Sequence, residues 1–390
     1  MNINRRIYTK VPLLSLLVVG FVGAMVMYWL LYQLTSTNPN SFQPNDLSVY
    51  FQSSRWVVGQ GTLYKDVFSE YPLLPNLIFG CFRFLAELFH HFSSSFHSFA
   101  WLWISASWFL YLGILYFIFT RLSKEGIWIW LGLAPFYFAL LRFDIYPATA
   151  VILALFFIRS KKYIHGACWL GIAIALKGYA LFILPAYFVF LYYKKGLRFA
   201  FVTTALCLAP FFFSQIVVFA YSGLEGLKQP YSFHLQRNLN GESTYDAILF
   251  LFPFPLLREL LNSLAKWLQI AMSILAAGLK PKSFEDLVNS FLLGILGFIS
   301  FSVFYSPQFL LWIISISCFS QNHFLNLLAI TFSWATFIYF PVLYGDSSIH
   351  ISENIPYAPL LFRTMIILIT AIRLAMIYEI LKNFKTLKVQ

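Results

Sequence analysis

Ionisable side chains interrupt the apolar runs of this 390-residue chain at a few separate places. Lys177 stands between IAIAL and GYALFILP, and Arg142 and Asp144 stand between LAPFYFALL and IYPATAVILALFF. A charge at mid-depth in a membrane helix costs roughly 2.5–3.5 kcal/mol, so charges at such places mark function by default. The alternative is that these residues only end tight helical hairpins, with Lys177 extending its amine to the membrane surface.

Two longer polar segments carry further candidates, and the first spans residues 35–72. In it, Asp46 precedes residues 47–58, whose helix-like apolar spacing suits a helix lying in the membrane interface. A carboxylate there can cap the helix, and it can also take a proton from a hydroxyl group if it faces a cavity. Asp66 and Glu70 are rival acids, and Glu70 can equally be a surface charge or bind a sugar hydroxyl or an arginine.

The second polar segment, residues 223–263, is expected to be a large loop. His234 and Arg237 are placed to share one side of a turn or helix, a pairing that suits phosphate binding. Glu242 follows them, and Gln308 lies later, next to a short break between apolar runs. The alternative is a featureless polar loop.

Common catalytic motifs are absent from the sequence, which has no GxxxxGK[ST], HExxH or GxSxG element and no GxGxxG after a strand. No Asp-x-Asp pair stands in an expected outer loop, and the histidines are scattered. The sequence therefore indicates no metal, no cofactor and no nucleotide-activated substrate. The four cysteines lie within apolar segments, as buried thiols do.

The composition is that of an integral membrane protein. Apolar residues make up 60% of the chain and charged residues 11%, against about 25% charged in soluble domains. The net charge of +12 comes from short basic clusters between apolar runs, so it indicates topology and not a nucleic-acid partner. The whole chain, residues 1–390, is expected to form one all-α, polytopic membrane domain.

About twelve apolar runs are candidate transmembrane helices, and several hold only about 14 residues, roughly 21 Å of helix. They are residues 12–34, 98–120, 126–141, 145–158, 163–176, 179–193, 199–222, 264–280, 284–304, 308–320, 324–342 and 359–380. This arrangement puts every basic cluster and both termini in the cytoplasm. The charged candidates then share the non-cytoplasmic face. Residues 73–92 are expected to be re-entrant or interfacial, with Arg83 and Glu87 spaced to pair.

The order of these elements resembles a known enzyme class. Asp46 in the first exterior loop, GTLYKD at residues 61–66 and Glu70-Tyr-Pro72 resemble the GT-C class of polyprenol-phosphate-sugar-dependent glycosyltransferases, and most closely family 87, which includes mannosyltransferases. The family often has a second proline where this chain has Leu73. The resemblance covers roughly residues 40–315, and the later elements that share it are Arg142-Phe-Asp144, Ala175-Leu-Lys177, His234-x-x-Arg237, Glu242-Ser243 and Ser306-Pro307-Gln308.

The resemblance implies an active site on the non-cytoplasmic face of the plasma (inner) membrane. The donor would be a mannose-like hexose on a polyprenyl phosphate, the acceptor a lipid or glycan, and Asp46 the base. The other candidates, Asp66, Glu70, Arg142, Asp144, Lys177, His234, Arg237, Glu242 and Gln308, would bind substrate. The alternatives are a transporter or flippase of lipid-linked glycans, although no internal repeat is visible, and a polymerase or ligase of surface polysaccharide.

Overall fold

A computed structural model describes residues 45–89, 95–122, 124–237, 239, 242–343 and 358–386. These residues are almost entirely helical, and their only strand-like pairing is an isolated bridge between Leu63 and Val67. The expectation of an all-helical chain is confirmed for the described ranges. The predicted first span, residues 12–34, lies outside them.

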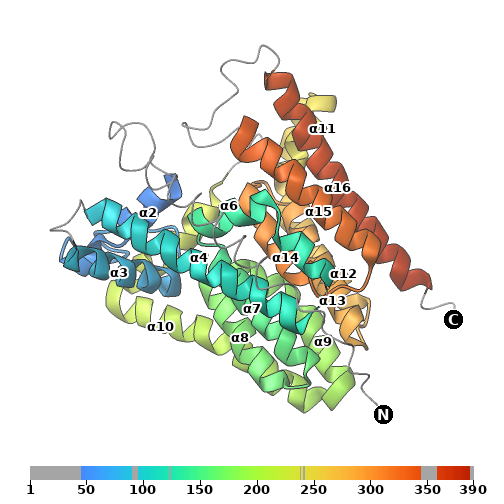
Figure 1. Cartoon of the computed structure of the whole chain (residues 1–390), viewed down its shortest axis with the longest axis horizontal. Helices are drawn as coiled ribbons and strands as arrows, with labels where there is room; N and C mark the ends of the chain where they lie inside the picture. The colour runs from blue at the N-terminus through green and yellow to red at the C-terminus, as the bar shows by residue number, and fades with distance from the viewer. Residues whose placement is uncertain are drawn as a thin grey trace.

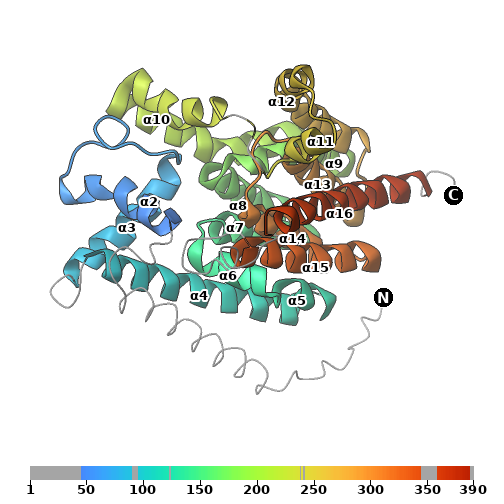
Figure 2. The same ribbon diagram turned by 90° about the horizontal axis from the view of Figure 1, so that it is seen from above.

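The helices follow one another in a simple order along the chain (Figure 1). They are α2 (Asn45–Ser53), η1 (Arg55–Val58), α3 (Leu73–Leu88), α4 (Ser95–Arg121), α5 (Lys124–Trp130), α6 (Leu133–Leu141), α7 (Ile145–Arg159), α8 (Tyr163–Leu176), η2 (Gly178–Ile183), α9 (Leu184–Lys195), α10 (Leu197–Leu235), α11 (Thr244–Leu251), α12 (Pro255–Gly278), α13 (Phe284–Ser300), η3 (Pro307–Phe309), α14 (Leu310–Ser317), α15 (His323–Phe337), η4 (Ile338–Leu343) and α16 (Ala358–Thr386). Figure 2 shows α2 and α3 at one side of the molecule and α15 and α16 at the other.

Five helices in the described part are long and apolar enough to cross a membrane: α4, α10, α12, α15 with the residues that follow it, and α16. The pair α6–α7 makes a sixth candidate if it counts as one span, but it bends by 113° at its break. Other predicted spans are broken: η2 interrupts residues 179–193, and η3 precedes α14. The chain thus has the helices of a multi-pass membrane protein, with five or six candidate spans in the described part.

The segment expected to be re-entrant or interfacial forms α3, of 16 residues, which packs against α4, α2 and η1. Arg83 and Glu87 form the ion pair that their spacing predicts, with 2.7 Å between Nη2 and Oε1. The Arg83 guanidinium also lies 3.7 Å from the ring centre of Phe51. These contacts attach α3 to the helix that carries Asp46.

The segment predicted as the second large loop is mostly helical. Helix α10 continues through a kink at Gly223 to Leu235, and α12 already begins at Pro255. Residues 197–222, before the kink, make a helix of about 39 Å, which already exceeds the roughly 30 Å of the hydrocarbon core. The part beyond Gly223, which carries Glu225 and Lys228, therefore extends past the length that a membrane can cover.

Helices α7 and α8 pack side by side, and they separate the Asp144–Lys177 ion pair at one end from a basic cluster at the other. The 15 residues of α7 place its ends about 22 Å apart. Asp144 precedes the start of α7 and Lys177 follows the end of α8, so both lie at the same end of the pair. The basic residues Arg159, Lys161 and Lys162 lie at the opposite end.

A close contact between helices holds α8 in place. A Cβ atom added at Gly171 would lie 2.6 Å from the carbonyl oxygen of Cys207 on α10. Small residues allow such close approach of membrane helices. Because Gly171 has no side chain, the backbones of α8 and α10 can pack closely, and this packing positions Lys177 at the end of α8.

Candidate functional site

Three ion pairs gather at breaks and ends of helices. Each joins segments far apart in the sequence: Asp46 with Arg142, Asp144 with Lys177, and Glu70 with Arg237. The charges of Asp46 and Lys177 both act on the Glu70 carboxyl group. The three pairs are therefore neighbours, and we call them the charged cluster.

Asp46 lies in the first turn of α2, and Arg142 follows the last residue of α6. Their side chains form an ion pair that is 24% exposed at Asp46 and 9% at Arg142. The Tyr50 hydroxyl donates to Asp46 Oδ2 over 3.2 Å and accepts from the backbone N–H of Phe143 over 3.0 Å. Tyr50 thus ties the helix that carries the carboxylate to the turn that carries the arginine.

An aromatic core fixes Tyr50 in that position. Its ring stacks on Phe79 of α3, with 4.5 Å between ring centres, and lies 5.0 Å from Trp103 of α4. Phe143 contacts the same three rings. Offset and edge-on contacts of this kind add about 0.5–1.5 kcal/mol each beyond area burial. Helix α2 is therefore held by apolar packing, and the Asp46 carboxylate lies at the edge of a rigid core.

Asp144 is the most enclosed acid of the cluster, with a side chain 1% exposed. Its two carboxylate oxygens accept from Lys177 Nζ over 2.8 and 2.9 Å, and Oδ1 also accepts from Trp312 Nε1 over 2.6 Å. The Trp312 ring stacks on Tyr179, with 3.9 Å between centres. The anion beside Lys177 is therefore a protein carboxylate, a partner 33 positions away that the sequence did not suggest.

Glu70 binds both members of the pair that we expected to bind phosphate. Arg237 Nη2 donates to Glu70 Oε2 over 2.8 Å, and His234 donates from Nε2 to the Glu70 carbonyl oxygen over 3.1 Å. The guanidinium lies between the rings of Phe233 and Phe304, at 4.7 and 4.2 Å from their centres. Burial raises the pKa of the Glu70 carboxyl, and the charge of Arg237 opposes that rise.

Glu242 joins the cluster from the segment between α10 and α11. Burial raises its pKa to about 7, while a hydrogen bond with Tyr339 and the charge of Arg142 act in the opposite direction. Gln308 lies in η3, where its side-chain oxygen accepts from Ser306, and the helix that carries Trp312 follows directly.

Asp66 differs from the other candidates. Its Oδ2 accepts from the backbone N–H of Thr62 over 2.9 Å, and its carbonyl oxygen accepts from Arg55 over 3.0 Å. Both contacts shape the turn that contains Asp66, so in the described residues this side chain organises its own loop.

Sequence reasoning missed Tyr50 and Trp312 as partners of the acids. Tyr50 could have been found, because it lies four positions after Asp46 on the expected helix, a spacing that brings side chains together. Trp312 is 168 positions from Asp144, and no local pattern predicts that hydrogen bond.

The described residues hold no group of three or more His, Cys, Asp or Glu side chains that could bind a metal ion. No family model matches the chain, and no curated protein or solved structure matches it significantly. The interpretation of the site therefore depends on its own geometry.

Proposed function

We propose that this protein is a membrane glycosyltransferase that moves a hexose, mannose-like, from a polyprenyl-phosphate donor to a hydroxyl group of a lipid or glycan acceptor. The observation that carries the proposal is the charged cluster, in which three cations and three carboxylates meet at helix ends. A leaving phosphate needs cations, and an acceptor hydroxyl needs a carboxylate.

Asp46 is the acid best placed to act as the base. Its side chain is 24% exposed, against 19% for Glu70 and 1% for Asp144. Asp144 is enclosed and accepts from two donors, so its role is to hold Lys177. Glu70 is paired with Arg237 as Asp46 is with Arg142, and Glu70 is the less exposed of the two acids. Asp46 thus combines access with a fixed position.

Lysine and arginine can bind a phosphate as well as a carboxylate, because each carries several N–H donors. Lys has three N–H donors and Arg has five. The Lys177 ammonium binds Asp144, remains 20% exposed, and lies over the rings of Trp312 and Tyr71, at 5.2 and 6.0 Å from their centres. Arg142 and Arg237 face the same cluster. The two acids Asp144 and Glu70 therefore orient cations that can still reach an incoming anion.

The reaction is a single displacement. The acceptor oxygen bonds to the anomeric carbon as its proton passes to the Asp46 carboxylate. The bond between the anomeric carbon and the phosphate oxygen breaks, and the electron pair leaves with the polyprenyl phosphate. Lys177, Arg142 and Arg237 stabilise the charge that develops on that leaving group. No nucleotide pocket is needed, because the donor carries a polyprenyl chain instead of a nucleotide and reaches the site from the bilayer.

The proposal includes the finer topology. Besides the five long helices, the predicted span at residues 12–34, the segment α5–α6 and the shorter helices α7, α8, α9, α13 and α14 complete a GT-C-like bundle of about twelve membrane passes. The charged cluster then opens on the non-cytoplasmic face of the inner membrane, and the basic end of α7 and α8 faces the cytoplasm.

The test is a transfer reaction. Purified protein is incubated with radiolabelled polyprenyl-phosphate mannose and a membrane lipid extract, and a labelled product that bears one added sugar is expected. Asp46→Asn should lower its rate of formation by about 10²–10⁴-fold. In sealed vesicles, a donor that crosses the bilayer unchanged would instead identify a flippase. A labelled long chain would identify a polymerase or ligase.

A further inference from the structure

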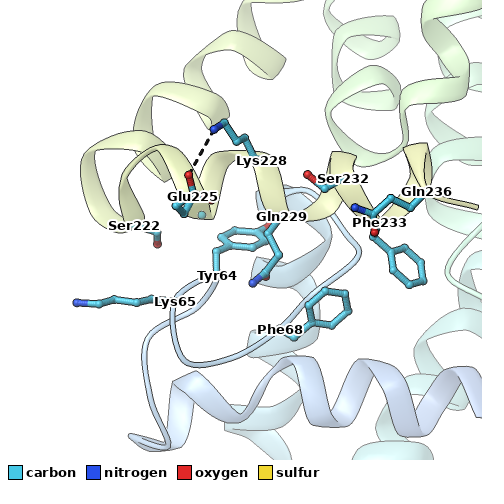
Figure 3. A pocket seen from close by; sticks show the side chains of 11 residues that line it. Tyr64, Lys65, Phe68, Ser222, Glu225, Lys228, Gln229, Ser232, Phe233 and Gln236 are labelled. Atoms are coloured by element: carbon cyan, nitrogen blue, oxygen red, sulfur yellow. Dashed lines mark hydrogen bonds and ion pairs between the residues drawn. The ribbon is translucent and has the colours of Figure 1, made fainter.

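An open pocket of about 450 Å³, with a mixed polar and apolar lining, lies beside the charged cluster but outside it (Figure 3). It opens between the loop around Tyr64 and the part of α10 that follows the Gly223 kink. We call it the α10 pocket. Its lining residues are Tyr64, Lys65, Phe68, Ser222, Glu225, Gly226, Lys228, Gln229, Ser232, Phe233 and Gln236.

The walls of the α10 pocket are fixed to each other. Gly223 has φ 69° and ψ −168°, a backbone conformation that is essentially restricted to glycine, and it redirects the helix over the loop. Ser222 Oγ donates to the Leu63 carbonyl oxygen over 2.8 Å, and the backbone N–H of Ser69 donates to Gln229 Oε1 over 3.1 Å. The pocket is therefore preformed, which reduces the entropy cost of binding.

A small apolar cluster supports the pocket floor. Leu63, Tyr64, Val67 and Val218 are buried together. The Tyr64 hydroxyl donates to the Tyr71 carbonyl oxygen over 2.6 Å, which anchors its ring. A Cβ atom at Gly226 would lie 3.2 Å from the Tyr64 Cβ, so helix and loop are in direct contact there.

The lining suits an uncharged, hydroxyl-rich ligand. Phe68 is 52% exposed and meets Phe233 edge to face, with 5.7 Å between ring centres. Gln229, Ser232 and Gln236, which carry side-chain amides and a hydroxyl, also line the pocket, and all three come from the end of α10 or the residue after it. An aromatic face beside amides and hydroxyls matches a sugar, which has an apolar C–H face and a hydroxyl rim.

The charges of the lining do not converge as a phosphate site requires. Lys228 Nζ is paired with Glu225 Oε1 at 3.3 Å. Lys65 extends away from the other lining side chains in Figure 3. A phosphate ligand is favoured where cations and N–H donors point at one place. The α10 pocket therefore favours a neutral carbohydrate over an anion.

One aromatic residue connects the pocket to the charged cluster. Phe233 lines the pocket, and its ring also contacts the guanidinium of Arg237, which binds Glu70. A ligand in the pocket therefore lies next to the cluster and separate from its carboxylates. We propose that the α10 pocket binds a neutral sugar unit of a glycan acceptor, remote from the reacting hydroxyl. This inference rests on the proposed glycosyl transfer for its role, but the binding itself does not require it.

The binding test uses the full chain in detergent and α-linked mannotriose as the probe. With about 10 mM trisaccharide, saturation-transfer NMR detects binding with a Kd near 1 mM. Signals from the trisaccharide are expected with the unchanged protein and should fall with Phe68→Ala and with Gln236→Ala. Phe84→Ala is the matched control, because Phe84 is similarly exposed, at 56%, on α3. Thermal unfolding of each variant shows that the fold is kept.

The outcomes separate this inference from the proposed function. Trisaccharide binding that depends on Phe68 supports the pocket even if no sugar transfer is found. If transfer occurs, Phe68→Ala should raise the acceptor KM about tenfold, while kcat and the donor KM stay unchanged. Absence of trisaccharide binding, or binding of inorganic phosphate alone, overturns the inference. So does an equal loss of signal in Phe84→Ala.

Discussion

Lys177 Nζ lies 2.8 and 2.9 Å from the two carboxylate oxygens of Asp144, although 33 positions separate the residues in sequence. The pair joins the break between α6 and α7 to the break between α8 and η2. Its Asp144 side is enclosed by Trp312. One pair therefore fixes two helix breaks and presents an ammonium group to the cluster.

Breaking this pair should destabilise the protein. Lys177→Met leaves the Asp144 carboxylate enclosed without its cation, and the loss of one partner of a buried pair typically costs about 3–5 kcal/mol. The double variant Lys177→Met with Asp144→Asn should unfold at a higher temperature than Lys177→Met alone, with a coupling of about 1–3 kcal/mol. The unfolding temperatures of the unchanged protein, the two single variants and the double variant are measured in one detergent. Strictly additive effects would show that the pair is not coupled.

Asp46→Asn should lower the transfer rate by about 10²–10⁴-fold, the usual cost of removing a positioned base. Donor binding should survive, because the cations remain. Asp66→Asn is the matched control and should keep near-native turnover, since Asp66 organises its own turn. Initial rates and donor affinity are measured for both variants. Near-native turnover in Asp46→Asn together with an inactive Glu70→Gln would move the base to Glu70.

The helices could be predicted from the sequence because apolar content and length report membrane spans directly. The helix expected at residues 47–58 appears as α2 and η1, and the Arg83–Glu87 pair follows from helical spacing. The segment predicted as an exterior loop, residues 223–263, is mostly helical, and its position outside the membrane stays a prediction. Polar composition indicated irregular chain, but α10 continues to Leu235, the Ser243 side chain caps α11, and Pro255 begins α12.

The partners within the site could not be predicted in the same way. Lys177 was recognised as a charge that needs an anion, but Asp144 reaches it only because α7 and α8 pack side by side. His234 and Arg237 were expected to bind one anion together, and both bind Glu70, 164 and 167 positions away. Such contacts depend on tertiary packing, which local spacing does not encode.

Protonation of Glu242 should make stability depend on pH. Burial raises its pKa from the ordinary value of 4.5 to about 7, so the folded state holds the proton more tightly than the unfolded chain does. The resulting stability is full below pH 4.5 and is lost as the pH rises through about 7. Glu242→Gln mimics the protonated form. Its unfolding temperature should match the unchanged protein near pH 4 and exceed it at pH 8, and a constant difference across this range would contradict the assignment.

Gly171→Ala should destabilise the packing of α8 on α10. The new methyl group would lie 2.6 Å from the Cys207 carbonyl oxygen, so the backbones must separate, at a cost of about 1–3 kcal/mol. Gly113→Ala is the matched control, because no atom lies within 4 Å of a Cβ there. Alanine also favours a helix by about 0.5–1 kcal/mol over glycine. Opposite shifts of the unfolding temperature are expected, and equal shifts would argue against the close contact.

Cysteine labelling should place the charged cluster and the basic helix ends on opposite sides of the membrane. Lys65 and Lys228 are exposed beside the α10 pocket, and Lys195 is exposed at the end of α9, in one of the basic clusters. The exposed Cys81 and Cys168 are first replaced by alanine. Ser243 is unsuitable as a labelling site because it is buried and caps α11.

On whole cells, a membrane-impermeant maleimide should label Lys65→Cys and Lys228→Cys but leave Lys195→Cys unlabelled until the cells are permeabilised. The reason is that basic clusters are retained in the cytoplasm. Helix α7 places the Asp144–Lys177 pair about 22 Å from the basic cluster at its other end. Labelling of only one of the two pocket positions would mean that the loop and the end of α10 are not on the same side. Labelling of Lys195→Cys alone would place the charged cluster in the cytoplasm, where a donor that enters from the outer leaflet could not reach Asp46.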